Sequence, residues 1–395
     1  MTTHRYPRRL PTRDTLAAAG GAALFSCALG LASVALPLLA IEAGYDAVQI
    51  GVLTAVSAIA QMVSRLGLGV VMRVLPDWTL VAGATVVLAA SNAMVAVSAA
   101  VVPFVVAQLL QGVARACFWT GSQTHAVRRE GSSVKSLAAV NFVSNVGLLL
   151  GPLLAGVLAA RSPAYALGWG AAMSALALVP TVFMDRLRPF RRVKDAGGGQ
   201  LWRRPGVAAG CWAGVTAGAW RGLVGSYVPV VLTHAGHTST VVGALVAVAN
   251  ATSVGGSAIA GRTSRAALSR AFAVCTVVTG VSLGVVGFLA GNAWLAGVAL
   301  GVSGLASGTL QTLGPAIASD SVHPEERGEA IAVAGTFRAA ALFVAPFGVA
   351  GLVLAIPLSA AIGVAGLLVT APALTVTRLR GALSASDHER QAIRE

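Results

Sequence analysis

The chain has 395 residues, of which 56% are hydrophobic and only 11% are charged, and its mean hydropathy is +0.78. Soluble domains carry about 25% charged residues, so this composition excludes a soluble fold and predicts a polytopic membrane protein. The net charge of +14 is spread over seven segments without a nucleic-acid-binding motif. Topology and anionic lipid headgroups explain this charge better than nucleic acid, which is not expected as a partner.

Long apolar stretches divide the sequence into about twelve predicted membrane helices, each close to the ~20 residues that cross a bilayer. The first stretch follows a basic run, but it is too long for the core of a secretory signal and is interpreted as the first membrane helix. The predicted spans are residues 15–40, 48–71, 79–100, 103–125, 137–160, 163–183, 206–232, 240–260, 268–290, 293–317, 329–354 and 357–377.

The basic residues are sorted between alternate gaps in this series. Twenty-three of the 28 Lys and Arg residues lie in every second gap or in the two tails, and the intervening gaps hold only Arg161. Cytoplasmic loops retain Lys and Arg during membrane insertion. We therefore expect a multi-pass protein of the plasma membrane, the inner membrane of the cell, with both termini in the cytoplasm.

Two motifs lie between the second span and the end of the fourth. Gly69 and Arg73 are four residues apart where the second span ends, with Met72 next to the arginine. The fourth span contains Gln108-Leu-Leu-Gln111-Gly, and Arg115 follows seven residues after Gln108. That spacing is two helical turns, so Gln108 and Arg115 are predicted to share one face.

The fifth span contains a run of glycines around a proline, formed by Gly147, Gly151, Pro152 and Gly156. Glycines one turn apart let two helices approach closely, and proline weakens the helical hydrogen-bond ladder and produces a bend. This run predicts a conformational role for the helix. Ordinary close packing in a membrane helix is the alternative.

The second half of the chain repeats the first. At an offset of 192 residues Pro37 aligns with Pro229, Gly44 with Gly236 and Arg73 with Arg265, without a gap over two spans. Six spans per repeat give both copies the same orientation in the membrane. The predicted organisation is an N-terminal tail at 1–14, a six-helix bundle at 15–184, a cytoplasmic linker at 185–205, a second bundle at 206–377 and a C-terminal tail at 378–395.

Together these patterns resemble the major facilitator superfamily, and the glycine-proline run resembles that of its drug and metabolite antiporters. Residues 69–73 are similar to the family's inner gate, with Met72 where an acid is usual and Asp77 as a shifted substitute. Gln108 stands where a related motif has arginine, and residues 323–329 look like the family's link into the eleventh span. The resemblance implies twelve helices in two bundles, alternating access, and a cavity lined by the first, fourth, seventh and tenth spans.

Four arginines lie inside predicted spans, where a charge costs at least about 2.5 kcal/mol. Arg115 and Arg221 are the best candidates for substrate contact or coupling, because their spans line the cavity in the resemblance. For Arg338 a structural role is equally reasonable, and Arg65 is more readily explained by backbone carbonyls or headgroups. The other candidate wall residues are Gln108, Gln111, Phe118, Trp119, Trp220, Tyr227, Ser307 and Gln311.

All fourteen acidic residues lie in loops, termini or span ends, so the buried acid of a proton-coupled cation exporter is not evident. Two interpretations stay open. The resemblance favours proton-coupled efflux of a drug-like or metabolite molecule, whereas the charges favour an anionic or neutral solute attracted by the arginines. A membrane sensor with a transporter fold is a third.

No hydrolase motif, paired buried aspartates or Walker A sequence occurs, and the four cysteines lie inside spans at none of the spacings used for metals. We therefore expect no enzyme activity, no cofactor and no metal. The expected partners are a small-molecule substrate, the lipid bilayer and protons as the candidate coupling ion, and the chain is expected to act as a monomer.

Overall fold

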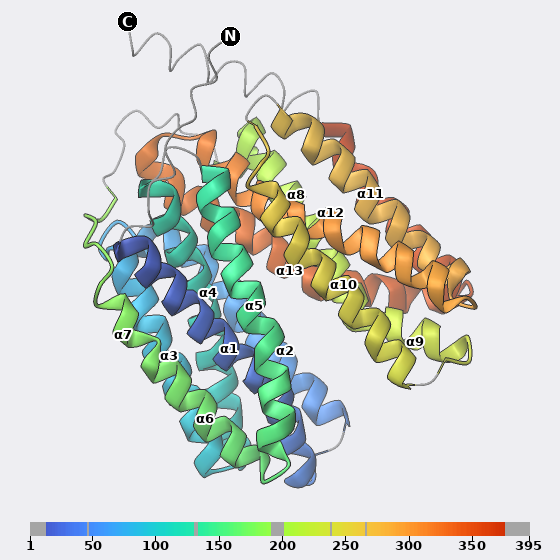
Figure 1. Cartoon of the computed structure of the whole chain (residues 1–395), viewed down its shortest axis with the longest axis horizontal. Coiled ribbons are helices and arrows are strands. Elements are labelled where there is room, and N and C mark those ends of the chain that lie inside the picture. Colours follow the sequence, from blue (N-terminus) through green and yellow to red (C-terminus); the bar gives the residue numbers. More distant parts are fainter. Residues whose placement is uncertain are drawn as a thin grey trace, which may run out of the picture.

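The computed structural model describes residues 13–45, 47–129, 133–190, 201–237, 239–264 and 267–375, and these are helical without a strand among them (Figure 1). The predicted C-terminal tail and the glycines at 197–199 lie outside the described residues. Each of the twelve predicted spans corresponds to one helix or to two consecutive helical segments. The twelve-helix fold class predicted from the sequence is therefore confirmed.

The helices of the first half begin and end close to the predicted spans. They are α1 (Arg13–Glu42), α2 (Ala47–Val71), α3 (Asp77–Val97), α4 (Val101–Arg129), α5 (Ser133–Ala159) and the consecutive pair α6 (Pro163–Leu176) and α7 (Leu178–Thr181). α4 and α5 are longer than the predicted spans 103–125 and 137–160. The span prediction follows apolar residues only, so it missed the polar residues that continue α4 at its end and α5 at its start.

The second half begins with the turn η1 (Leu201–Arg203). The helices that follow are α8 (Pro205–Gly225) with α9 (Tyr227–His234), α10 (Ser239–Ala260), α11 (Leu268–Leu289), α12 (Ala293–Asp320), the turn η3 (Pro324–Glu326), α13 (Arg327–Val353), and α14 (Leu358–Thr370) with η4 (Ala371–Thr375). In the described part of the chain, nine helical segments are long and apolar enough to cross a membrane.

The internal repeat is visible in a turn that the two halves share. Gly44 and Gly236 have φ values of +83° and +89°, a conformation that glycine adopts without steric cost. In both turns the residue after the glycine, Tyr45 or His237, donates its backbone N–H to the carbonyl five residues earlier. This pattern closes a helix with a left-handed residue, so the aligned glycines have the same structural role.

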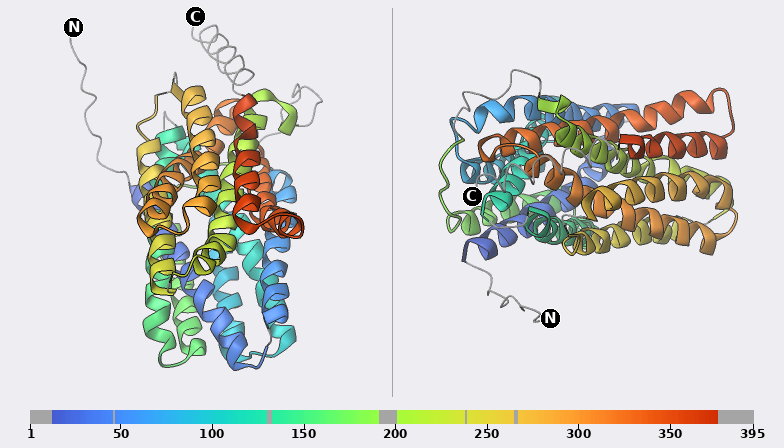
Figure 2. Two further views of the ribbon diagram at one scale, coloured as in Figure 1. Left: turned by 90° about the vertical axis from the view of Figure 1, so that its right-hand side faces the viewer. Right: turned by 90° about the horizontal axis from the view of Figure 1, so that it is seen from above.

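The helices pack into two bundles. In the first, α1 packs against α5 and α6, and α3 packs against α4; in the second, α8 packs against α13, α10 against α12, and α11 against α14. The bundles meet through α2 with α13 and through α5 with α10. In the left view of Figure 2 the second bundle, yellow to red, lies above, and the first, blue to green, extends below it.

The two bundles touch near one end of the molecule and separate toward the other (Figure 1). The contacts between them join the last turns of α2 and the start of α5 to the start of α13 and the last turns of α10 and α12. We call this end, where the linker leaves the first bundle, the linker end, and the opposite end the far end. Toward the far end α5 and α13 carry exposed apolar side chains such as Leu153 and Phe347.

The outer surface of both bundles is apolar. Val97, Trp294 and Leu354 are each more than 85% exposed, at 89%, 86% and 90%. Soluble proteins rarely expose so much contiguous apolar surface. These faces therefore fit a hydrocarbon environment, in agreement with the multi-pass membrane protein predicted from the sequence.

Candidate transport cavity

A cavity of about 540 Å³ lies between the two bundles. Its walls come from α1, α2, α4 and α5 of the first bundle and from α8, α10, α12 and α13 of the second. Ligand pockets have volumes of about 300–1,000 Å³. The cavity therefore has the size of a small-molecule site, and both bundles contribute to it.

Four arginines line this cavity, namely Arg65 on α2, Arg115 on α4, Arg221 on α8 and Arg338 on α13. They are the four arginines that the sequence places inside predicted spans. No lining residue in the described part of the chain is acidic. The wall of the cavity is therefore strongly positive, with two arginines from each bundle.

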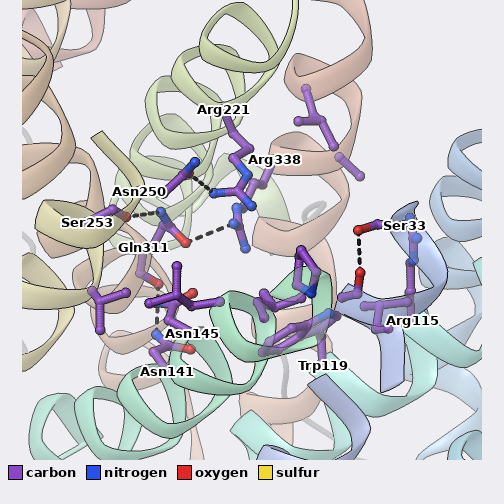
Figure 3. A pocket seen from close by; sticks show the side chains of 18 of the residues that line it. Ser33, Arg115, Trp119, Asn141, Asn145, Arg221, Asn250, Ser253, Gln311 and Arg338 are labelled. Atoms are coloured by element: carbon purple, nitrogen blue, oxygen red, sulfur yellow. Dashed lines mark hydrogen bonds between the residues drawn. The ribbon is translucent and has the colours of Figure 1, made fainter. Parts of the chain in front are cut away.

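Neutral amide groups hold three of the four guanidinium groups. Arg115 donates from Nη2 to Oε1 of Gln111 at 2.7 Å, one turn earlier on α4. Arg221 donates from Nη1 to Oδ1 of Asn250 at 2.6 Å, and Figure 3 shows both side chains at the cavity. Amide oxygens orient the guanidinium groups without cancelling their charge, so the positive charge stays available to a ligand.

Gln311 on α12 connects the arginine wall to both bundles. Its Oε1 accepts a hydrogen bond from Nη2 of Arg338 at 2.9 Å, while its Nε2 donates to Oγ of Ser253 at 3.2 Å (Figure 3). Its backbone oxygen accepts a bond from Nδ2 of Asn141 on α5 at 3.3 Å. A neutral network thus fixes Arg338 and at the same time joins the two bundles within the wall of the cavity.

Arg65 lies in the cavity wall and is only 7% exposed. The sequence favours backbone carbonyls or headgroups as its environment, whereas the structure places its guanidinium directly against the Cα of Gly335 on α13. Arg65 and Arg221 are both close enough to Arg338 for their charges to repel. Like charges at this density in an apolar surrounding favour a negative occupant.

The remaining wall is largely apolar. Leu148, Leu149 and Leu153 of α5 line one side, with Trp119 of α4 near them, and Leu342 of α13 lies on the opposite bundle. Apolar walls with a few convergent polar groups are typical of ligand pockets. The cavity is suited to a molecule with both an apolar part and a negatively charged part.

The structure brings together five of the nine predicted substrate-binding or coupling residues. Arg115, Arg221, Arg338, Trp119 and Gln311 line the cavity.

Several of the other predicted wall residues lie behind the cavity instead. Gln111 is buried and accepts the bond from Arg115, while Gln108 is buried and is not part of the cavity lining. Trp220 is fully buried in the core of the second bundle, where its Nε1 donates to Oγ of Ser303 at 3.0 Å, and Tyr227 packs against the same core. The faces of a uniformly apolar helix cannot be told apart from spacing alone.

Phe118 and Ser307, also predicted as wall residues, are fully buried as well. Phe118 stacks on Phe25 of α1, with ring centroids 3.7 Å apart. These side chains support the helices that carry the arginines and have no surface in the cavity.

Neutral polar residues of α5 and α10 are the part of the site that the sequence prediction did not include. Asn141, Asn145, Asn250 and Ser253 line the cavity together with the arginines. Asn145 also donates from Nδ2 to Oγ of Ser257 on α10 at 3.3 Å, which joins the bundles again. The spacing of Asn141 and Asn145, one helical turn within an apolar span, was the available signal.

The glycine-proline run of α5 packs against α1 of its own bundle. A Cβ atom at Gly147 would lie 2.5 Å from the carbonyl oxygen of Ala23, and one at Gly151 would collide with the carbonyl oxygen of Cys27. Pro152 lines the cavity, whereas a Cβ atom at Gly156 would meet nothing within 4 Å. The hydrogen bonds of α5 to the other bundle come from Ser133, Asn141 and Asn145 rather than from the region of these glycines.

The predicted gate residues lie between α2 and α13 at the linker end. Arg73 pairs with Glu329, Nη2 to Oε2 at 2.8 Å, and Gly69 leaves room for the stem of Glu329. Met72, at the position where the resemblance leads one to expect an acid, is buried against Gly328 of α13. We call these five residues the linker-end gate; it combines one ion pair with an apolar contact.

Two further contacts close the same end. Ser133 of α5 donates a hydrogen bond to Asp320 of α12, and Arg327 of α13 donates from Nη1 to the carbonyl oxygen of Val127 at 3.1 Å. Together with the ion pair of Arg73 and Glu329, these contacts join the bundles at the linker end, while the bundles lie apart toward the far end (Figure 1). The structure therefore shows a state that is closed at the linker end, with the two bundles separated at the far end.

Comparisons with known proteins agree with this architecture. A family model described as the Major Facilitator Superfamily matches residues 18–346. The fold is similar to that of the human organic anion transporter MFSD10 (TETRAN), with a TM-score of 0.75 and 16% identity over 93% of this chain and 100% of that one. It is also similar to the transporter FucP in the outward conformation, with a TM-score of 0.70 and 14% identity over 94% and 98%.

A variant of the E. coli fucose:proton symporter FucP gives a TM-score of 0.68 and 12% identity over the same shares of the two chains, 94% and 98%. No curated protein sequence matches the chain. At these identities the structural likeness concerns the fold alone.

Proposed function

The chain belongs to the Major Facilitator Superfamily of membrane transporters, and we propose that it moves a small organic anion across the plasma membrane by alternating access. The four arginines of the cavity carry this proposal. They come from both bundles, the side-chain hydrogen bonds of Arg115, Arg221 and Arg338 go to amide oxygens, and no acidic side chain of the described residues lines the cavity. An anion is the occupant that offsets this charge.

The distribution of charged and apolar residues over the cavity wall supports an anion with an apolar body. Arg221 and Arg338 of the second bundle lie near each other, while Arg65 and Arg115 come from the first. A ligand with two negative groups would offset more of the repulsion than a single carboxylate. The leucines of α5 and Trp119 would contact the apolar part of the ligand. The shared fold with a human organic anion transporter agrees with this ligand class.

Proton-coupled efflux of a drug-like cation or metabolite is the alternative that the family resemblance favours. Such a mechanism normally uses a membrane-buried acid at the binding site. The described lining of the cavity supplies arginines in that place. Hence this alternative needs a proton carrier elsewhere, and the geometry favours the anion.

The orientation proposed from the charge pattern makes the linker end cytoplasmic. The observed state is then outward-facing, with the cavity accessible from outside the cell. The cavity is complete within one chain, which supports function as a monomer. Rearrangement of the linker-end gate would open the cavity to the cytoplasm.

The proposal is tested by thermal unfolding of the purified protein with matched ligands. Phthalate, benzoate, benzamide and benzylammonium share one ring and differ in charge. A ligand that binds only the folded state stabilises it by about 2.7 kcal/mol at a concentration of 100 times its Kd. We expect phthalate to raise the Tm most, benzoate less, and the other two not at all. Stabilisation by benzylammonium without stabilisation by either acid would refute an anion site.

A further inference from the structure

The segment that follows α7, residues 185–190, is fastened to the linker end of the first bundle. The backbone N–H of Asp185 donates to Oδ1 of Asp14 at 2.5 Å, and the backbone N–H of Phe190 donates to the carbonyl oxygen of Met72 at 3.0 Å. These bonds lie at the two ends of the segment. Although the sequence predicts a flexible linker here, its first residues have a defined path across the ends of α1, α2 and α4.

A buried group of charged side chains lies beneath this segment. His125 of α4 places Nε2 3.1 Å from Asp14 at the start of α1 and Nδ1 3.3 Å from Asp77 at the start of α3. All three residues are at least 94% buried. Nε2 is in hydrogen-bond geometry with Asp14, whereas Nδ1 is at ion-pair distance from Asp77 without that geometry, so the contact with Asp77 stabilises the group when the ring is protonated and charged. In that form His125 ties the ends of α1, α3 and α4 together.

Arg128, one turn after His125, connects this group to the segment. Its Nη1 lies 3.4 Å from Oδ2 of Asp77, and its Nη2 donates to the carbonyl oxygen of Arg188 at 2.7 Å. The same guanidinium lies over the ring of Phe190, 4.4 Å from its centroid. One side chain therefore fixes both the backbone of the segment and its aromatic ring. Cations over aromatic faces are held by the charge distribution of the ring.

Phe190 is 6% exposed and is buried among residues of both bundles. Leu68, Met72 and Ala116 come from the first bundle and Ala332 comes from α13 of the second. A Cβ atom at Gly328 of α13 would lie 2.9 Å from Cε2 of Phe190, so ring and helix backbone are in close contact. The ring therefore fills the space beside Met72 in the linker-end gate.

We propose that Phe190 is a further component of the linker-end gate and that Arg128, held by the Asp14–His125–Asp77 group, is its positioning residue. Opening of the gate moves α13 away from α2, and the ring then loses its contacts with Ala332 and Gly328. Its contacts with the first bundle persist, because the segment is fastened there. Phe190 thus stabilises the state that is closed at the linker end, whatever ligand the cavity takes.

Interspin distances measured in the full-length protein in lipid nanodiscs test this proposal without any ligand. One spin-label pair, Val74→Cys with His323→Cys, reports on the linker end; a second, Val101→Cys with Trp294→Cys, reports on the far end. All four native cysteines are replaced by alanine first. The populations of short and long distances give the ratio of closed to open states at each end.

We expect Phe190→Ala to raise the open population at the linker end about tenfold and to shorten the far-end distance. The substitution removes the apolar contact between the ring and α13, which exists only in the closed state. The matched control is Phe183→Ala. Phe183 also lies against an arginine, with Arg13 4.7 Å from its ring centroid, but it is 45% exposed. This control should leave both distance distributions unchanged.

The positioning role makes a separate prediction. Arg128→Gln should shift the linker-end distances in the same direction as Phe190→Ala, and the double variant should shift them no further than Phe190→Ala alone. If Phe190→Ala fails to give monodisperse protein, Phe190→Leu should give a smaller shift in the same direction. Unchanged distances in folded Phe190→Ala or Phe190→Leu protein, or an equal shift in Phe183→Ala, would overturn the proposal.

Discussion

Replacing Arg338 by glutamine removes one charge from the cavity and leaves its support nearly intact. Gln311, which accepts the hydrogen bond of Arg338, keeps its bond to Ser253, and a glutamine at 338 retains two of the three methylene groups of the arginine stem and a neutral N–H donor. The substitution also relieves the repulsion that Arg338 experiences from Arg221 and exerts on Arg65. We therefore expect the Tm of the ligand-free variant to equal or exceed that of the unmodified protein.

The affinity for an anion, in contrast to the stability of the ligand-free protein, should fall. A hydrogen bond to a charged group contributes about 1.5–3 kcal/mol, which corresponds to an increase in Kd of about 10- to 150-fold. The effect on phthalate should lie in this range, because Arg338 is partly buried and lines the cavity. The neutral diamide of the same ring can still accept a bond from glutamine, so its affinity should change by less than about threefold.

Isothermal titration of the purified protein measures both affinities directly. Arg161→Gln is the matched control, because Arg161 is exposed, lies over the ring of Tyr165 and does not line the cavity. It should leave both affinities unchanged. Equal losses for the acid and the diamide in Arg338→Gln, or a loss of the same size in Arg161→Gln, would show that the arginine does not act through its charge.

Three further predictions concern the two bundles. Arg73→Glu should raise the open population at the linker end about fivefold, since an exposed ion pair contributes up to about 1 kcal/mol; the interspin distance checks this, and adding Glu329→Arg should reverse it. Gly151→Ala should destabilise the protein by about 1–3 kcal/mol through overpacking against α1, whereas Gly156→Ala, with open space around it, should not lower the Tm. Asn141→Ala removes the bonds to Gln311 and Thr312 of the second bundle and should also increase linker-end opening in the same measurement; an unchanged distance distribution would contradict this role.

The architecture could be predicted from the sequence because it depends on properties that act over many residues. The length of the apolar stretches, the sorting of basic residues and the repeat at an offset of 192 each involve whole helices. The shared turn at Gly44 and Gly236 shows that even a local detail of the repeat was readable. The four intramembrane arginines were found for a similar reason, because a charge inside an apolar span is rare and stands out without any structure.

The remaining site residues could not be found in this way, because their roles depend on which helix face is turned inward. Trp220 and Asn250 both lie in spans near the cavity, but Trp220 points into the core of its own bundle and Asn250 points to Arg221. Helices of nearly uniform hydropathy give no periodic signal that separates these faces.

The group around His125 was missed for a different reason. Asp14, Asp77 and His125 lie at span ends, where charged residues are normally solvated. They come together because α1 and α3 begin, and α4 ends, at the linker end of the first bundle, where the segment 185–190 covers them. Contacts between residues so distant in the sequence require the folded chain.

The charge of the transported molecule is measured most directly by transient currents from proteoliposomes adsorbed on a solid-supported membrane. Rapid addition of phthalate, benzoate or benzylammonium at constant ionic strength reports the sign of the charge that enters the protein. We predict currents of negative charge with the two acids, absent or greatly reduced in Arg338→Gln, and none with the amine. Currents of positive charge with benzylammonium and silence with both acids would contradict an anion-transporting cavity.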